Sequence, residues 1–296
     1  MRNTLKTFAL MAGMTAMFGG AGMVLAGTGG MAVALGVAGV MNLASWWFAD
    51  KIILGLYGAD EVKQGRAYDI TRELATRARM PMPRVCLVKT AQPNAFATGR
   101  TPQKGVVAVT TGLLDILDDR ELRGVIAHEL AHIKNRDTLT MTLTATMAGG
   151  LSMLAWGIGG RRGNNPLATL AVMAVALVVA PLVQLAVSRT REYAADRAGA
   201  EISGDPEALA QALLKLETAA RTAPNKTAEQ NPATAHMFII NPLPRKSGGS
   251  DSFFSTHPRT ANRVQELYNF AAEKKMPVSE RNAAVDPLFG TGNSRS

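Results

Sequence analysis

The chain has 296 residues, of which 47% are hydrophobic, 19% are charged and 5% are aromatic, and its formal net charge is +9. Its basic residues are scattered and are not grouped with aromatic side chains, so the charge indicates an anionic membrane surface and not nucleic acid as the partner. The single cysteine, Cys86, excludes an internal disulfide and agrees with a reducing compartment for the soluble part of the chain.

The apolar residues are concentrated in long uncharged stretches, which indicates membrane segments and not two soluble cores. No charged residue lies between Lys6 and Asp50, a length that crosses a bilayer core of roughly 30 Å twice, with residues 27–30 (Gly-Thr-Gly-Gly) as the turn. We therefore expect a transmembrane hairpin over residues 1–50. A cleaved signal peptide is the alternative, but the stretch is longer than a signal sequence and ends in an interfacial anchor, Trp46-Trp47-Phe48.

Residues 51–137 carry the charges and turns of a first soluble part. Alternating charges at helical spacing predict a helix over residues 59–79, which ends before Pro81. Three short segments predict a small antiparallel sheet: residues 84–89, 94–99 and 105–110. The run Asn94-Ala95-Phe96-Ala97 either packs under the next helix or pairs as an edge strand with an extended peptide substrate, and the two roles are compatible.

Residues 128–132 read His-Glu-Leu-Ala-His, which is the most informative motif of the chain. A random chain of this length contains such a motif at a rate on the order of one per cent. Side chains four residues apart share one face of a helix, so His128 and His132 can bind one metal ion while Glu129 points to the same site. A catalytic zinc needs a third protein ligand and leaves its fourth position for water.

The helix that carries this motif starts at a capping box, Asp118-x-x-Glu121, and beyond Gly124 it contains no Gly or Pro before Gly149. We expect it to run directly into a third membrane segment, which places the metal site at the membrane surface. Uncharged stretches of about one spanning length lie at residues 138–160 and 163–188. They predict a second transmembrane hairpin over residues 138–188 and four transmembrane helices in all.

Basic residues at the segment ends predict that both termini and the metal site are cytoplasmic. The flanking residues on that side are Arg2, Lys6, Lys51, Lys134, Arg136, Arg189, Arg191 and Arg197, whereas the connection inside the first hairpin has no charge. Arg161 and Arg162 oppose this orientation, because they fall in the short loop of the other side.

Residues 189–296 form the second soluble part. Helices are expected at its start, over residues 206–220 and over residues 258–274, and residues 221–255 predict a loop or partly mobile insert. Glu192 and Asp196 lie four apart on the first of these helices. Because the third and fourth segments are antiparallel neighbours, Glu192 can supply the missing ligand, with Asp196 accepting a hydrogen bond from a ligand imidazole. Spacing alone leaves a surface salt bridge to a neighbouring arginine equally open.

Several residue groups resemble, in the same chain order, the HtpX membrane zinc metalloproteases, relatives of the CAAX-prenyl protease. They are His128-Glu129-x-x-His132 with Asn135-Arg136-Asp137, Ser188-Arg189-x-Arg191-Glu192-Tyr193-x-Ala195-Asp196, Pro93-Asn94-Ala95-Phe96-Ala97-Thr98-Gly99, and Ser255-Thr256-His257-Pro258 with Arg263. The resemblance covers nearly the whole chain, including the layout of its segments.

The resemblance implies a gluzincin-like zinc metalloprotease domain with one zinc ion per chain and Glu192 as the third ligand. It also implies a bacterial inner-membrane protein that cleaves unfolded or damaged membrane proteins for quality control. The expected fold class is therefore α+β, mostly α, with four transmembrane helices and a cytoplasmic catalytic domain that carries a small antiparallel sheet.

In this chemistry zinc lowers the pKa of its bound water towards about 7, and Glu129 takes the proton as the hydroxide attacks a peptide carbonyl. Two roles stay open for His257, which either stabilises the developing oxyanion or makes a structural contact near a helix start. Arg263 orients Asp196 or His257, or else forms a surface ion pair.

Two other classes of function compete with a protease. A metal-stabilised membrane scaffold without catalysis predicts a closed four-ligand site and has no use for Glu129. A transporter or channel predicts ionisable residues inside the apolar segments, and these segments contain none. The protease is therefore the preferred hypothesis.

Overall fold

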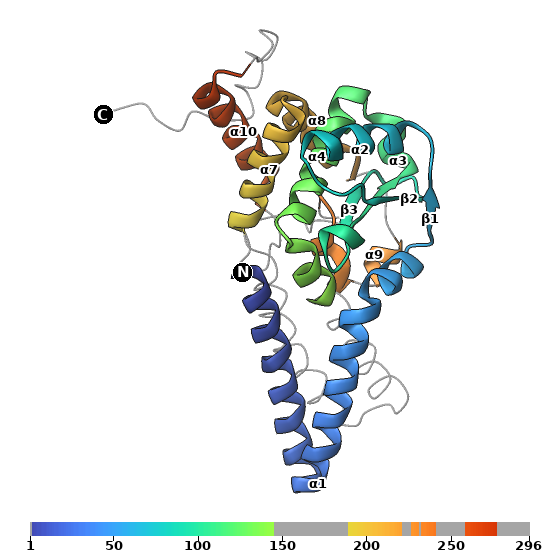
Figure 1. Ribbon diagram of the computed structural model, residues 1–296, viewed down its shortest axis with the longest axis vertical. Coiled ribbons are helices and arrows are strands. Elements are labelled where there is room, and N and C mark those ends of the chain that lie inside the picture. The colour runs from blue at the N-terminus through green and yellow to red at the C-terminus, as the bar shows by residue number, and fades with distance from the viewer. Residues whose placement is uncertain (1, 145–188, 221–225, 231, 241–257, 277–296) are drawn as a thin grey trace, which may run out of the picture.

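The computed structural model describes residues 2–144, 189–220, 226–230, 232–240 and 258–276. The first elements are α1 (Arg2–Leu56), β1 (Ala59–Val62), α2 (Arg66–Arg77), β2 (Arg84–Val88), β3 (Ala95–Thr98), η1 (Pro102–Lys104), β4 (Val106–Thr110) and α3 (Thr111–Ile116). They are followed by α4 (Asp119–Lys134), α7 (Arg189–Ser203), α8 (Pro206–Ala220), α9 (Lys226–Gln230), η2 (Pro232–Met237) and α10 (Thr260–Lys274). Figure 1 shows a head, which holds the sheet and the shorter helices, on a stem made by α1.

The stem α1 consists of two helical arms that fold back on each other at Gly27, within the glycine run where the turn was expected. Gly27 has a φ of 64°, which glycine adopts without steric cost. The arms approach so closely that a Cβ on Gly22 would come within 2.4 Å of the Gly30 carbonyl oxygen. The Asn42 amide donates to the Thr15 hydroxyl across the arms at 2.7 Å, as polar side chains do between membrane helices.

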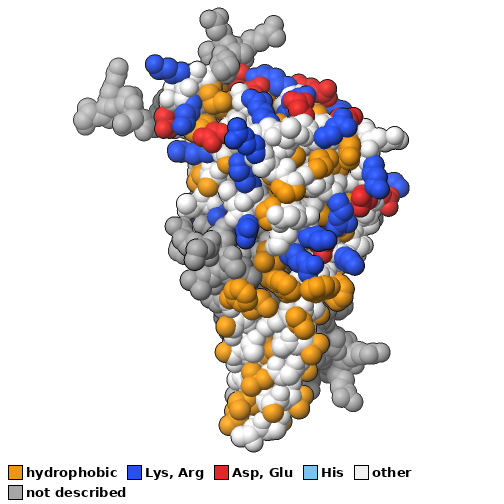
Figure 2. All heavy atoms as spheres, in the orientation of Figure 1, with side chains coloured by type: hydrophobic (Ala, Val, Ile, Leu, Met, Phe, Trp, Pro, Cys, Tyr) orange, Lys and Arg blue, Asp and Glu red, His pale blue; other side chains and the backbone are white. Residues whose placement is uncertain are grey.

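The surface of α1 is apolar and open. Within the described residues, one stretch, Ala26–Leu56, is long and apolar enough to cross a membrane. Exposed large apolar side chains along α1 are Phe8, Met23, Met31, Val33, Leu35, Val37, Val40, Leu43, Trp47, Phe48 and Ile52. Figure 2 shows orange side chains on the lower stem and charged ones over the head. Where stem and head meet, the Arg100 guanidinium lies 4.2 Å from the Trp47 ring centroid.

The sheet is mixed, with strand order β1-β2-β4-β3. β1 pairs with β2 and β3 pairs with β4 in antiparallel fashion, but β2 and β4 are parallel. The expected purely antiparallel sheet is therefore wrong. β3 and β4 form an antiparallel hairpin through η1, and β4 runs parallel to β2. Because β4 pairs with β2 on one edge and with β3 on the other, β4 lies in the interior of the sheet and β3 lies at its border.

β1 corrects a second expectation, because residues 59–62 form a strand and not the start of a helix over residues 59–79. Gly58 and Gly65 have φ values of 57° and 98°, so the backbone turns before and after this strand. The helix α2 starts only at Arg66 and ends before Pro81, as expected. Residues 59–62 pair with the free edge of β2. This tertiary contact outweighs the helical preference that their charge pattern indicated.

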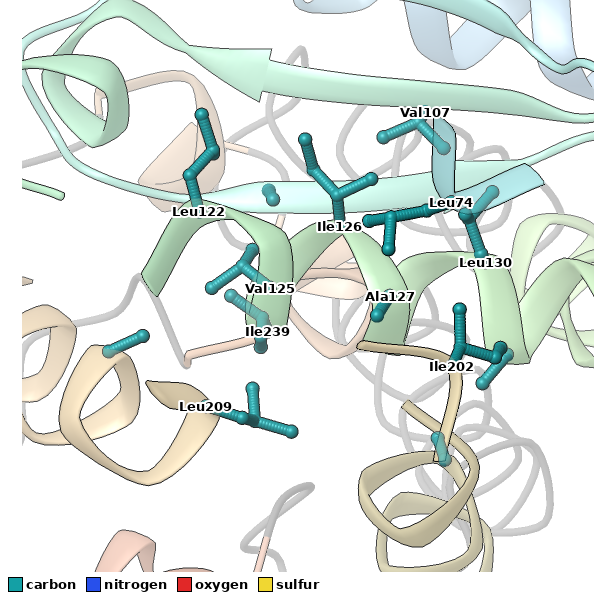
Figure 3. Packing of buried hydrophobic residues seen from close by; sticks show 14 of the residues in the cluster. Leu74, Val107, Leu122, Val125, Ile126, Ala127, Leu130, Ile202, Leu209 and Ile239 are labelled. Atoms are coloured by element: carbon teal, nitrogen blue, oxygen red, sulfur yellow. The ribbon is translucent and has the colours of Figure 1, made fainter. Parts of the chain in front are cut away.

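The helix α4 is the centre of the head. Its N-terminus carries the predicted capping box, in which Asp118 and Glu121 satisfy each other's backbone N–H groups. One face of α4 packs on the sheet and α2, and the other packs on α7 and α8. Figure 3 shows this core, where apolar residues of α4 meet side chains from the surrounding elements, among them Leu122, Val125, Ile126, Leu130, Leu74, Val107 and Leu209.

The expected continuation of α4 into a membrane segment is wrong. α4 ends at Lys134, Arg136 takes a left-handed conformation with a φ of 60°, and a new helical stretch covers residues 137–144. The Arg136 N–H donates to the Ile133 carbonyl at 3.1 Å, which is typical of a helix end with a left-handed residue. Residues 145–188, the rest of the predicted hairpin over residues 138–188, lie outside the described residues.

The C-terminal helices α7, α8 and α10 lie where the sequence predicted them. The segment 221–255 was expected to be a loop, but its described part contains α9 and η2. This part also forms an antiparallel bridge to β3, between Phe238 and Phe96. Apolar burial explains the difference, because Phe238 packs against Phe96 and Tyr57 in a second core cluster.

Candidate metal centre

Three buried donors from two helices converge at the centre of the head. His128 and His132 of α4 have their Nε2 atoms 3.2 Å apart. The Glu192 carboxylate of α7 lies 3.8 Å from His128 Nε2 and 3.7 Å from His132 Nε2. Ligands of a tetrahedral zinc ion with bonds of about 2.0 Å are about 3.3 Å from one another, so the donor set fits one such ion. Within the described part of the chain, this is the one group of His, Cys, Asp or Glu residues with such an arrangement.

The first turn of α7 reaches this point because α7 and α4 pack without an intervening side chain. Gly199 of α7 faces the backbone of His128, where a Cβ would come within 2.9 Å of the histidine Cα. Glu192 is therefore buried beside the histidines, whereas Arg197 on the exposed side of α7 pairs with Glu266 at 3.2 Å. The alternative, a surface salt bridge between Glu192 and a neighbouring arginine, is therefore wrong, because Glu192 is buried.

His128 is held from behind by a buried carboxylate and a buried arginine. Its Nδ1 lies 2.9 Å from Asp196 Oδ1. Arg263 of α10 donates to both oxygens of Asp196, from Nε at 2.8 Å and from Nη2 at 2.7 Å. Burial alone would raise the pKa of Asp196, but the charge and hydrogen bonds of Arg263 outweigh it and lower that pKa. The surface-pair alternative for Arg263 is excluded by this buried, bidentate geometry.

The protonation of the site follows from burial and charge. Burial lowers the pKa of His128, which keeps its imidazole neutral and its Nε2 free to act as a donor to a metal. Burial also lowers the pKa of His132, but a hydrogen bond to Asp137 and the charges of Glu192 and Glu129 outweigh it and raise that pKa to about 9. The carboxylates therefore attract a cation to this point, which is a proton on His132 or a metal ion in its place.

Glu129 lies between the metal centre and the sheet. Its carboxyl is buried and accepts a hydrogen bond from the backbone N–H of Ala97 in β3. Burial raises its pKa to about 7, with a further contribution from the charge of Glu192. A carboxyl with such a pKa can both take and release a proton near neutral pH, as a general base requires.

The outer edge of β3 is already paired. The Ile239 N–H donates to the Ala95 carbonyl at 3.1 Å, and the Asn94 amide donates to the Ile240 carbonyl at 2.9 Å. Arg263 Nη1 donates to the Ile239 carbonyl at 2.9 Å, so the segment 238–240 lies between β3 and the residues behind His128. Under this cover and the surrounding helices, the four central residues are between 0% and 3% exposed: His128, Glu129, His132 and Glu192.

Two residues near the centre did not enter the sequence-based site. The Asp137 carboxylate lies 3.3 Å from His132 Nδ1, and Arg191, one residue before Glu192, is half-buried with both terminal guanidinium nitrogens buried. Both belong to the motifs that carry the family resemblance, but spacing did not assign them a role. His257, the other candidate catalytic residue, lies outside the described residues.

Comparisons with known proteins show the family to which the chain is similar. The model of Peptidase family M48 matches residues 61–271. The chain is 53% identical over 277 residues to a protein named Protease HtpX homolog from Methylibium petroleiphilum, an alignment that covers 90% of this chain and 97% of that protein. A crystal structure of Ste24p from S. mikatae aligns with a TM-score of 0.45 and 16% identity, over 77% of this chain and 56% of Ste24p.

Proposed function

Since the chain belongs to peptidase family M48 and is a membrane metalloprotease, we propose that it is a zinc endopeptidase whose metal is held by His128, His132 and Glu192. The family match includes all three residues. The observation that carries the ligand assignment is the convergence of two Nε2 atoms and one carboxylate on a single buried point. Two imidazoles and one carboxylate, with room for a water, are a donor set that catalytic zinc prefers.

The side chains around the metal site have different roles in hydrolysis. When bound, zinc supplies Lewis acidity towards the water and the scissile carbonyl. Glu129 accepts the water proton and later delivers it to the leaving amine, which its pKa of about 7 allows. Asp196 accepts the Nδ1 hydrogen of His128 and so keeps its Nε2 directed at the metal, while Arg263 holds Asp196.

The substrate is bound as an extended peptide along the outer edge of β3, at residues Asn94 to Ala97. Backbone groups of an edge strand pair with a peptide in register, and Ala97 lies beside the general base Glu129. The segment 238–240 occupies this edge in the described conformation, so a substrate strand takes its place. Access to the zinc therefore includes the departure of this segment.

The substrates we propose are unfolded or damaged membrane proteins in the bacterial inner membrane. The open apolar surface of α1 supports a membrane anchor, and basic residues near the segment ends favour a cytoplasmic head and termini. The chain then divides into a transmembrane hairpin (1–50), a catalytic part (51–137), a second transmembrane hairpin (138–188) and a second catalytic part (189–296). The metal helix α4 lies directly before the second hairpin, which keeps the site near the bilayer.

The deciding experiment is cleavage of a detergent-solubilised model membrane protein by the purified chain, with and without a zinc chelator. Cleavage that stops with the chelator and returns with added zinc supports the proposal. A matched Glu129→Gln variant separates catalysis from a contaminating protease, because it retains the ligands and lacks the base. Cleavage by that variant at the rate of the parent would exclude the proposed mechanism.

A further inference from the structure

Asp137 repeats on His132 the contact that Asp196 makes on His128. Its Oδ2 lies 3.3 Å from His132 Nδ1, and both side chains are buried. Each of the two histidines thus directs Nε2 towards the common metal point and Nδ1 towards a carboxylate. A carboxylate in this place selects the tautomer with the hydrogen on Nδ1 and fixes the orientation of the ring.

A continuous helix would not allow this contact. Residues five apart on a helix are separated by about 140° around the axis and about 7.5 Å along it, so Asp137 would point away from His132. The backbone instead breaks after Lys134, with Arg136 in the left-handed region, and restarts as a helix at Asp137. That region is rarely adopted by a residue with a long side chain, which indicates that tertiary contacts hold the turn.

Several contacts around the turn are buried and specific. The Thr138 hydroxyl donates to the Gly99 carbonyl at 2.8 Å, which ties the new helix to the loop after β3. The Thr142 hydroxyl lies 2.9 Å from the Thr98 hydroxyl at the end of the same strand. The helical stretch 137–144 thus packs against β3 and the loop after it, and its first residue, Asp137, is held beside His132.

Arg191 supplies a positive charge near Asp137 and Glu192. Its two terminal nitrogens are buried and have no hydrogen-bond partner within the described part of the chain. The carboxylates whose charges act on its guanidinium are those of Asp137 and Glu192. A buried carboxylate needs such compensation, which Asp196 receives from its ion pair with Arg263.

We propose that Asp137 is a positioning residue that accepts the Nδ1 hydrogen of His132 and keeps its Nε2 on the metal, with Arg191 as the opposing charge. The break at Arg136 places Asp137 for this role. The motif of this chain is then read as His-Glu-x-x-His followed, five residues after its second histidine, by a carboxylate. This inference rests on the proposed function, because it takes His132 as a ligand.

The test measures metal binding in a Glu129→Gln background, where self-cleavage cannot interfere. Zinc affinity is determined by competition with a chromogenic chelator, and the visible spectrum of the cobalt-loaded protein reports ligand geometry. Asp137→Ala is expected to weaken zinc binding roughly 100-fold, and Asp137→Asn, which keeps an acceptor oxygen of the same shape, roughly 10-fold. Both shift the cobalt bands. Asp115→Asn, an exposed aspartate of α3, is the matched control and changes neither quantity.

The outcomes separate the inference from the function on which it rests. His132→Ala in the same background loses zinc if His132 is a ligand, and retention of zinc by this variant overturns the ligand assignment. If His132→Ala loses zinc but Asp137→Asn binds zinc and cobalt as the parent does, the positioning role is wrong. Thermal unfolding of the metal-free variants shows whether each variant folds. If Asp137→Ala does not fold, the zinc affinity and cobalt spectrum of Asp137→Asn alone test the positioning role.

Discussion

Gly199 of α7 packs directly on the backbone of His128 of α4, with space for a hydrogen but not for a methyl group between them. A Cβ at this glycine would lie 2.9 Å from both the Cα and the N of His128. The contact sets the distance between two helices that each supply donors to the metal centre. The position of Glu192 relative to the histidines thus depends on the close helix contact that Gly199 allows.

Gly199→Ala is expected to weaken zinc binding and to destabilise the head by about 1–3 kcal/mol, because the added methyl group forces α7 away from α4. Alanine is otherwise the better helix residue, so a loss can only come from the contact. Gly55→Ala, at a helical glycine with nothing within 4 Å of its Cβ position, is the control and is expected to be neutral or slightly stabilising. Zinc content and thermal unfolding measure both effects. Unchanged zinc content in Gly199→Ala would contradict this account.

Glu192→Ala is expected to remove most of the bound zinc, because two imidazoles alone bind the ion weakly. The control is Glu201→Ala, an exposed glutamate on the same helix, which retains full metal content. Metal analysis of both purified proteins after dialysis decides the point. Full zinc in the Glu192 variant would show that another group is the third ligand.

Glu129→Gln is expected to keep its fold and its zinc and to lose 10²-fold to 10⁴-fold in turnover, since an amide has the shape of the acid but cannot accept the proton of the water. Turnover on a fluorogenic peptide measures the effect, with KM expected to change little. A variant that retains near-normal turnover would remove Glu129 from the mechanism.

Locking the segment 238–240 on β3 is expected to abolish peptide cleavage. Cysteines at positions 96 and 238, which face each other in the antiparallel bridge, should form a disulfide in a Cys86→Ser background. The oxidised protein is expected to be inactive and the reduced form of the same protein active, so any loss of packing is common to both. The Phe238→Cys single variant controls for the reductant. Equal activity in both redox states would mean that substrates do not need this edge.

The orientation of the head is tested with single cysteines in a background of Glu129→Gln and Cys86→Ser. A cysteine at the exposed position Thr76 is expected to be protected from a membrane-impermeant thiol reagent in intact cells. A cysteine in the predicted loop at residues 163–165 is expected to react. The reverse pattern would place the catalytic head on the outer side and give Arg161 and Arg162 the decisive weight.

Local patterns were enough to predict the metal helix and its key residues. The capping box at Asp118 sets the start of α4, and the four-residue spacing of His128 and His132 puts both on one face because the period of a helix is a local property. The glycine run at the turn of α1 and the Glu192–Asp196 spacing were visible for the same reason. No alignment of strands or helices is needed to read these features.

Tertiary contacts decided what short-range periodicity does not encode. Arg136 is not a residue that marks a helix end, and contacts such as that of Thr138 with Gly99 hold the helix break that brings the Asp137 carboxylate beside His132. The parallel pairing of β2 with β4 and the cover of β3 by Phe238 also join segments far apart in the chain. The sequence thus predicted the proposed ligands His128, His132 and Glu192, whereas their orientation and burial arise from packing between elements that are far apart in the chain.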